Sequence, residues 1–308
     1  MILKEQSYSY LRITLLPCIL VSVSSCQTGA QPAEFSPGQA TGMVTSEEIT
    51  EASGMVASRK QNDVLWIHND SGHSPTVYAV TPQGTLLASY RVMDATLRDW
   101  EDIALGPGPE PGQDYLYIGD IGDNQGRYAS ITVYRVKEPH IQSRPTTPAL
   151  LRTDPAQALH LIYPDGARDA ETLLIDPLTK DIYIITKREL ASRVYWAPFP
   201  HATDRPITLK FMTPLPWRWA TGGDVAPDGQ AVLVRSIMHA SRFQRIPGEP
   251  LWKAFGAPHQ TIPIRAHIKG EAICFDAQGR GYYSLNEGKN PSIYYYRRTP
   301  PSDDTEKN

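Results

Sequence analysis

Five acidic residues recur along the chain at intervals of 50, 70, 53 and 47 residues, each near the start of a short apolar segment. They are Glu51, Glu101, Glu171, Asp224 and Glu271. Carboxylate oxygens are preferred ligands of hard divalent cations, so a ring of these side chains predicts a metal site, most plausibly for Ca²⁺. Without a cation, converging carboxylates repel one another. The alternative role is structural, since each acid can instead accept hydrogen bonds from backbone amides of the next repeat.

Two segments of similar sequence, HNDSG from residue 68 and GDIGDN from residue 119, are rich in polar side chains. Each follows a predicted strand, and loops on a rigid scaffold are where binding sites usually lie. We therefore expect ligand-binding roles for Asn69, Asp70, Asp120, Asp123 and Asn124. The alternative is that these side chains only bond their own backbone in Asx-turns.

Basic residues are expected on the same face as the acids. Lys187 and Arg188 follow one predicted strand, and Arg235 ends another, AVLVR. Arginine can hold phosphate or carboxylate through two parallel hydrogen bonds, so these residues indicate binding of a small anionic ligand. They could equally serve only to balance the charge of the acidic ring.

Candidate catalytic residues are Glu101, Asp102 and His68, any of which could act as a general base toward a water bound to the cation. A histidine in a loop is more often a solvated side chain. The sequence contains no G-x-S-x-G, H-E-x-x-H or G-x-x-x-x-G-K-[ST] motif. Two tryptophans, Trp100 and Trp219, lie just before repeat acids, where they could stack on a sugar or a base or simply pack in the core.

The elements that carry these residues are short runs of β-branched and aromatic residues bounded by turn residues. After each acid comes a turn and a second strand, such as YLYIGD from residue 115, and four repeats continue into a third. About four strands in 40–50 residues, repeated, is typical of a β-propeller. We predict an all-β fold of five four-stranded antiparallel blades, closed by an N-terminal strand around residues 42–49. One alternative is six blades, because residues 139–169 are more than five blades need. The other is a β-sandwich or two small β domains.

The N-terminus resembles a bacterial lipoprotein signal. Residues 1–25 contain Lys4, Arg12 and an apolar run too short to span a membrane. Val23-Ser24-Ser25-Cys26 matches a lipobox, in which Cys26 becomes lipid-modified. The alternative is an ordinary cleaved signal. We expect residues 26–45 to be a flexible tether, 46–299 the propeller and 300–308 a disordered tail, in an exported lipoprotein of the outer membrane, cell surface or periplasm.

Charge and cysteine content narrow the classes of partner. The formal net charge is −3 and the isoelectric point is near 6.2, which argues against nucleic acid as the main partner. Membrane contact is expected only through the N-terminal lipid. Cys274 lies in an apolar strand and reads as a buried free thiol, so no disulfide framework is predicted.

Three segments, EASGM from Glu51, DWEDIA from Asp99 and YIGDIGDN from Tyr117, resemble bacterial exported β-propellers of the SdiA-regulated and phytase-like (esterase-like) kind. The resemblance spans about residues 45–297 and implies a propeller with a cation site in its central channel. By motif, Glu51, Glu101 and Asp102 match the acidic positions of that family, with Ala52 as a small departure. The phytase-like catalytic pattern is incomplete here, so the resemblance assigns no catalytic residue.

Two classes of function follow from these observations. In the first, the protein binds a divalent cation and a small anionic or polyhydroxylated, sugar-like ligand, or an envelope protein, at the channel mouth. In the second, it is a metal-dependent hydrolase of phosphoesters, esters or lactones. The lack of a complete catalytic motif favours the first class.

Overall fold

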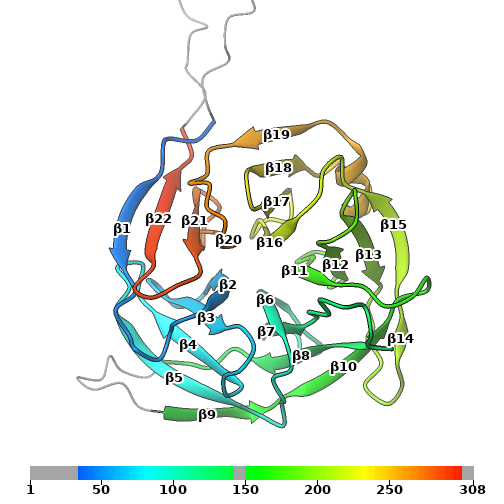
Figure 1. Ribbon diagram of the computed structural model, residues 1–308, viewed down its shortest axis with the longest axis horizontal. Helices are drawn as coiled ribbons and strands as arrows, with labels where there is room; N and C mark the ends of the chain where they lie inside the picture. Colours follow the sequence, from blue (N-terminus) through cyan, green and yellow to red (C-terminus); the bar gives the residue numbers. More distant parts are fainter. Residues whose placement is uncertain (1–33, 142–149, 300–308) are drawn as a thin grey trace, which may run out of the picture. The chain divides into compact units, whose positions relative to one another are not determined.

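The computed structural model describes residues 34–141 and 150–299. Within these ranges the chain forms five sheets arranged around a central axis, like the blades of a propeller (Figure 1). This confirms the predicted five-bladed all-β fold, with four antiparallel strands in each blade. The described residues contain no helix long and apolar enough to cross a bilayer. The predicted signal segment, Cys26 and the tail at 300–308 lie outside the described residues.

We number the blades in chain order and name their strands from the axis outward. Blade 1 contains β2 (Ala52–Ala57), β3 (Leu65–Asn69), β4 (Thr76–Val80) and β5 (Leu86–Met93). Blade 2 contains β6 (Trp100–Pro107), β7 (Asp114–Asp120), β8 (Ile131–Lys137) and β10 (Gln157–Ile162). Blade 3 contains β11 (Ala170–Ile175), β12 (Ile182–Thr186), β13 (Arg193–Ala197) and β15 (Lys210–Pro214).

Blade 4 contains β16 (Ala220–Val225), β17 (Ala231–Ser236), β18 (Ala240–Gln244) and β19 (His259–Ile262), with a 3₁₀ turn, η1 (Leu251–Gly256), before its last strand. Blade 5 contains β20 (Gly270–Phe275), β21 (Gly281–Asn286), β22 (Ser292–Arg297) and, as its outer strand, β1 (Gln39–Met43). The ring is therefore closed by a strand from the N-terminal side of the chain, as predicted.

The closing strand lies earlier in the sequence than the predicted segment 42–49, and within the predicted tether. The reason is a close backbone contact at Gly42, where a side chain would collide with the backbone of Gln83. The Thr41 hydroxyl also donates to the Pro82 carbonyl oxygen at 2.6 Å. These contacts seat β1 against a turn of blade 1, which fixes its position in the ring.

The long step between the second and third acids does not hold a sixth blade. Part of it forms β9 (Leu150–Pro155), which pairs in parallel with β5 at the outer edge of blade 1. The chain then returns to blade 2 through β10. A second short strand, β14 (Ile207–Thr208), pairs in parallel with β10 in the same way. Blade 1 thus carries a parallel outer strand from the chain that leads into blade 2, and blade 2 carries one from the chain that leads to the outer strand of blade 3; the sequence pattern did not reveal either strand.

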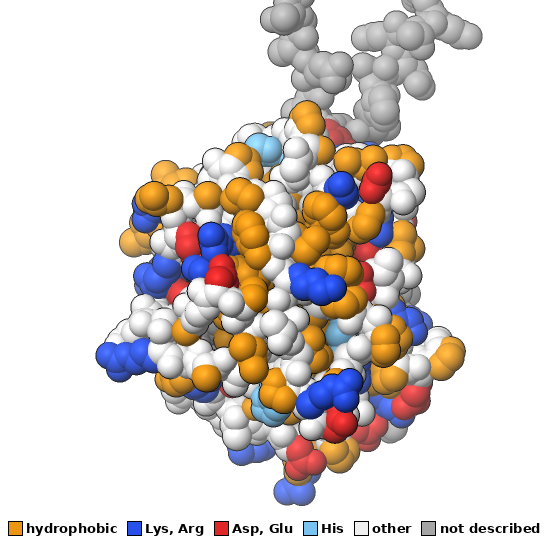
Figure 2. Space-filling view, turned by 90° about the vertical axis from the view of Figure 1, so that its right-hand side faces the viewer, with side chains coloured by type: hydrophobic (Ala, Val, Ile, Leu, Met, Phe, Trp, Pro, Cys, Tyr) orange, Lys and Arg blue, Asp and Glu red, His pale blue; other side chains and the backbone are white. Residues whose placement is uncertain are grey.

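The core lies between neighbouring blades. All residues of the inner strands β2, β11 and β16 are buried, because each packs on both faces in the centre of the ring. Trp66 and Trp100 are fully buried in the cluster that joins blades 1 and 2. The outer edge of the ring instead carries both apolar and charged side chains, as Figure 2 shows. Lys210, for example, covers the ring of Trp196 at 5.0 Å.

Every inner strand begins with an irregular register. In four blades the register shifts around a single residue: Glu101, Glu171, Thr221 and Glu271. In blade 1 the shift falls between Ala52 and Met55. A β-bulge redirects the side chain of its extra residue, and bulges are common next to functional sites. We call the face on which the inner strands begin the mouth. The loops that follow the second strands emerge on the same face, as predicted.

Candidate functional site

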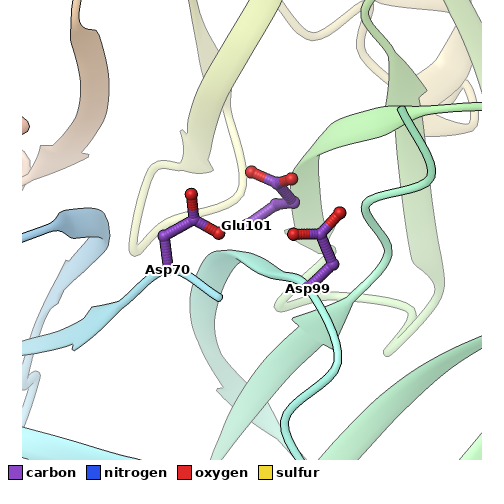
Figure 3. A group of neighbouring side chains, drawn as sticks. All are labelled: Asp70, Asp99 and Glu101. Atoms are coloured by element: carbon purple, nitrogen blue, oxygen red, sulfur yellow. The ribbon is translucent and has the colours of Figure 1, made fainter. Parts of the chain in front are cut away.

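Three carboxylates meet at the mouth between blades 1 and 2. Asp70, Asp99 and Glu101 each offer an oxygen, and these atoms all lie within 4.8 Å of one another. Figure 3 shows the three side chains directed toward a common point. We call this group the unpaired triad. Its residues come from three local positions: just after β3, just before β6 and the bulge of β6.

The backbone around the unpaired triad is held by loop hydrogen bonds. The Asp70 amide donates to the Glu51 carbonyl at 2.9 Å, and the Gly122 amide donates to the Asp99 carbonyl at 3.2 Å. A side chain at Gly122 would collide with the carboxylates of Glu101 and Asp99. Glycine at this position therefore lets the loop pass close beneath both acids.

Glu101 is the central member of the triad. Its residue is 6% exposed, and within residues 34–141 and 150–299 no hydrogen bond or ion pair engages its carboxylate. Burial raises the pKa of Glu101 well above its usual value, and the charges of Glu171, Asp70 and Asp99 raise it further. Burial and neighbouring acids also raise the pKa of Asp99 to about 6. A carboxyl in this setting is protonated or needs a cation.

A second group of three shares Glu101 with the first. Glu101, Asp169 and Glu171 also offer oxygens within 4.8 Å of one another. Here cations are already present: the Lys187 ammonium forms an ion pair with Glu171, and Arg188 Nε lies 2.6 Å from Asp169 Oδ2. We call this group the paired triad. Its built-in cations distinguish it from the unpaired triad.

Lys187 sits among three glutamates. Burial by itself would lower the pKa of Lys187, but the charges of Glu171, Glu271 and Glu101 outweigh it and raise that pKa. Burial nevertheless raises the pKa of Glu171 to about 8, against the opposing effect of Lys187. Burial also raises the pKa of Glu271 to about 7, although Lys187 and Arg235 oppose the shift. One lysine therefore does not neutralise the acids around it.

Three of the five predicted ring acids belong to neither triad. Glu271 still acts on Lys187 through its charge, whereas the other two have different surroundings. Glu51 precedes β2, its side chain is 48% exposed, and its Oε2 lies 2.9 Å from Nε2 of His73. Asp224 is the fifth residue of β16, and its two oxygens accept the amides of Val225 at 2.8 Å and Phe275 at 2.9 Å. The predicted ring of five equivalent acids is thus wrong for these two, because even spacing in sequence does not give equal register in the strands.

Asp224 belongs to a set of latches between neighbouring inner strands. Asp102 is its counterpart, because its oxygens accept the amides of Ile103 and Leu173, both at 2.9 Å. The Ser53 hydroxyl donates to the Glu101 carbonyl at 2.7 Å in the same manner. Asp102 is buried, and burial raises its pKa well above the usual value. The structural alternative is therefore correct for Asp102, which does not reach a ligand as a catalytic base.

His68 is also unsuited to the catalytic role predicted for it. The residue is fully buried, and its ring packs edge-to-face on Trp100 at 5.8 Å between centroids. Its Nδ1 bonds the Asn69 carbonyl oxygen at 2.9 Å. Burial lowers the pKa of His68 to about 4, so the ring is neutral at physiological pH. A side chain enclosed in this way cannot contact a solute at the mouth.

Most of the predicted ligand-binding loop residues instead accept hydrogen bonds from their own loop or from a neighbouring segment of the chain. Asn69 Oδ1 accepts the amides of residues 50 and 51, and Asp120 Oδ1 accepts those of residues 98 and 99. Asp123 accepts the amides of residues 127 and 128, and Asn124 Oδ1 accepts a hydrogen bond from Arg188. Only Asp70 of this set joins the unpaired triad.

Arg235 was predicted to bind a ligand but lies in the interior. It is fully buried, and Nη1 donates to the carbonyls of Ala272 and Leu285 at 3.1 and 3.0 Å. Its Nη2 donates to Asn286 Oδ1 at 2.7 Å. Burial lowers its pKa to about 10, which leaves it charged at neutral pH. Arg235 therefore joins blades 4 and 5 and is not available to a ligand.

Two site residues, Asp99 and Asp169, were absent from the predicted set. Each lies two positions before a bulge glutamate, in the segments DWE and DAE. The repeated D-x-E spacing was the signal that could have identified them. Residues two apart in an extended chain point to the same side, so this spacing by itself predicts that the aspartate and the glutamate lie together.

No known protein family and no curated protein matches this sequence. Solved structures with similar folds include a nidogen/laminin complex, at 10% identity and a TM-score of 0.43, covering 77% of this chain and 72% of that chain. A luciferin-regenerating enzyme matches at 11% identity and a TM-score of 0.40, covering 83% and 94%. Hydrazine synthase of Kuenenia stuttgartiensis matches at 11% and 0.42, covering 84% and 98%. These likenesses are too distant to indicate an activity.

Proposed function

We propose that the protein binds one divalent cation, Ca²⁺, at the unpaired triad and uses it to hold a ligand at the mouth. The observation that carries this proposal is the carboxylate of Glu101, which is buried, without a partner among the described residues, and aimed at two further acids (Figure 3). Calcium takes six to eight oxygen ligands, so three carboxylates leave positions for water and for ligand oxygens.

The ligand of this proposal is small and either anionic or polyhydroxylated. The mouth is rich in acids, so an anion would be repelled unless the cation were bound first. Lys187 and Arg188 stand beside the triad, but Glu171 and Asp169 already engage them. The cation, rather than these side chains, would therefore supply most of the attraction for ligand oxygens.

The same proposal includes export and anchoring through Cys26, as the N-terminal segment suggests. The described part of the chain is compatible with such a tether. Phe35 forms an isolated bridge with Arg298, and β1 runs from Gln39, opposite Tyr295, to Met43, opposite Ser292 at the start of β22. Phe35 therefore lies on the face opposite the mouth.

A metal-dependent hydrolase of phosphoesters, esters or lactones is the second candidate. The observation that favours it is the state of Glu171, because burial raises the pKa of this residue to about 8. Glu171 also lies next to Glu101, which is one of the proposed cation ligands. A carboxyl that keeps its proton near neutral pH can donate it to a leaving group. A bound cation would supply a water of lowered pKa as the nucleophile. In this hydrolase mechanism neither Asp102 nor His68 acts as a catalytic residue.

Calcium titration by calorimetry tests the first proposal. The full-length protein is expected to bind one Ca²⁺, and the Glu101→Gln variant is expected to lose this binding. Glu51→Gln is the matched control, because it removes an exposed acid from the same face and should leave affinity nearly unchanged. Equal binding by all three proteins, or no binding by any, would refute the cation site. A panel of ester and phosphoester substrates with Ca²⁺ then separates binding from hydrolysis.

A further inference from the structure

The face opposite the mouth carries a cavity of about 750 Å³ over blades 4 and 5. It lies where the turn between β16 and β17, the turn between β20 and β21 and the end of β22 meet. Among the described residues of its wall, the charged ones are three arginines and one aspartate: Arg280, Arg297, Arg298 and Asp228. The cavity is large enough to receive a small organic molecule, and the excess of positive charge favours an anion.

Strand pairing brings the three arginines together. The amide of Arg298 donates to the Arg280 carbonyl at 2.8 Å, and Arg297 lies opposite Gly281 in the pairing of β21 with β22. The arginines therefore stand at the ends of two neighbouring strands of one blade. A site carried by paired strands is positioned more precisely than a site carried by a free loop.

Two of the three guanidinium groups have no acidic partner in the described structure. Arg298 Nη2 lies 2.8 Å from Glu34 Oε1, so this arginine is already paired. Within residues 34–141 and 150–299, no carboxylate lies at ion-pair distance from Arg280 or Arg297. Arg280 Nη2 instead donates to the uncharged Oε1 of Gln278 at 2.9 Å. The charges of Arg280 and Arg297 are therefore available to an anion in the cavity.

The acids nearest to these arginines are occupied by hydrogen bonds of their own turns. Asp276 Oδ1 accepts the amides of Gln278 at 3.0 Å and Arg280 at 2.9 Å. Its Oδ2 accepts the hydroxyl of Tyr295 at 2.7 Å. Asp228 Oδ1 likewise accepts an amide of its own turn at 2.9 Å. Both acids thus hold the wall of the cavity in shape and do not pair with its arginines.

A second cavity of about 400 Å³ adjoins the first, because Gln278, Arg280 and Tyr295 line both. It extends between blades 5 and 1 on the same face. Two acids, Asp63 and Asp276, line this second cavity together with a single arginine. Its wall therefore suits an uncharged, hydrogen-bonding part of a ligand better than an anionic one.

We propose that the two cavities bind a phosphate monoester, with the phosphate between Arg280 and Arg297 and a polar body directed toward the second cavity. A guanidinium can donate two parallel hydrogen bonds to phosphate oxygens. A phosphate monoester carries between one and two negative charges at neutral pH, which matches two unpaired arginines. The site is independent of the proposed cation site, because it lies on the other face and uses no residue of either triad.

Calorimetry of the full-length protein in the presence of chelator tests the proposal, since chelator prevents binding through a cation at the mouth. The probes are glycerol phosphate, inorganic phosphate and glycerol. We expect glycerol phosphate to bind most tightly and glycerol not to bind. The double variant Arg280→Gln/Arg297→Gln should weaken binding of glycerol phosphate about tenfold or more, because it removes charge-assisted hydrogen bonds. Arg205→Gln is the matched control, since Arg205 is also exposed but lines neither cavity.

Each outcome bears on the phosphate site alone. Absence of binding of either phosphate at millimolar concentration overturns the proposal. Unchanged affinity in the double variant, or equal weakening in the double variant and in Arg205→Gln, overturns it as well, because the attraction would then come from general charge. Thermal unfolding verifies that each variant is folded. Glu101→Gln should bind glycerol phosphate like the wild type, so loss of the cation site leaves this result unaffected.

Discussion

The ammonium of Lys187 forms an ion pair with the carboxylate of Glu171, whereas Glu101, the acid shared by the two triads, has no such partner among the described residues. This difference divides one acidic cluster into two unequal halves. The paired triad carries its own cation on a side chain. The unpaired triad needs a proton or a cation from solution, which is why we place the calcium ion there.

Replacing Lys187 should convert the paired triad into a second cation site. In Lys187→Met, the metal-free protein is expected to lose about 3 kcal/mol of stability above a pH of about 8, where Glu171 is ionised, because breaking a buried ion pair then leaves a buried charge unmatched. Calorimetry should then report two bound Ca²⁺ ions instead of one. The double variant Lys187→Met/Glu171→Gln is the control, since it should regain stability and bind a single ion. One ion at unchanged affinity in Lys187→Met would contradict this account.

Metal-free protein should lose stability as the pH rises from about 4.5 to about 8. The pKa of Glu171 is raised to about 8 and that of Glu271 to about 7 in the folded state, so between these limits the folded chain holds more protons than the unfolded chain. Stability then falls with rising pH, by at most about 1.4 kcal/mol per pH unit for each group. Urea unfolding with chelator at several pH values measures the slope.

The matched comparison for this pH dependence is Glu171→Gln. Its unfolding free energy should exceed that of the wild type increasingly above pH 5, and saturating Ca²⁺ should flatten the wild-type curve. Buried histidines change the stability in the opposite direction. The pKa of His68 is lowered to about 4 in the folded state, so stability is lost as the pH falls below about 6.5. They are common to both proteins and cancel in the difference. Parallel curves for the two proteins would show that Glu171 does not titrate in this range.

Asp224 should behave as a latch and not as a cation ligand. Its carboxylate accepts two amides, one of them from the inner strand of blade 5, so Asp224→Ala leaves two buried donors without partners. We expect a loss of about 2 kcal/mol or more in the free energy of unfolding, with Ca²⁺ affinity unchanged. Asp228→Ala, in an exposed turn, should change stability by less than about 0.5 kcal/mol. A stable Asp224→Ala protein that no longer binds calcium would reverse this assignment.

Trp219 should be unfavourable for stability at its position. Because its φ is positive, Trp219→Gly is expected to be more stable than Trp219→Ala by about 1 kcal/mol, although both lack the ring. Thermal unfolding of the two variants measures the difference directly. Equal stability, or a less stable glycine variant, would show that the backbone at this position carries no strain.

The repeat and the fold class could be predicted from the sequence because their signals are local. Alternating and β-branched runs such as IYIIT at β12, separated by turn residues, define strands without reference to distant residues. The entry of each inner strand could likewise be located, so Glu101 and Glu171 were correctly placed at the mouth. The outer strands β9 and β14 were missed because they form only through pairing with strands of another part of the chain.

The composition of the site was decided by the tertiary structure. Glu51 and Asp224 have the same residue types and nearly the same spacing as Glu101 and Glu171, yet one faces solvent and the other binds backbone amides. The difference comes from strand register and bulges, which long-range pairing sets and which turn a side chain to another face with a shift of one residue. The sequence by itself thus determined that acids would gather at the mouth. Which acids meet, and which of them Lys187 neutralises, depended on strand register and on how neighbouring blades pack.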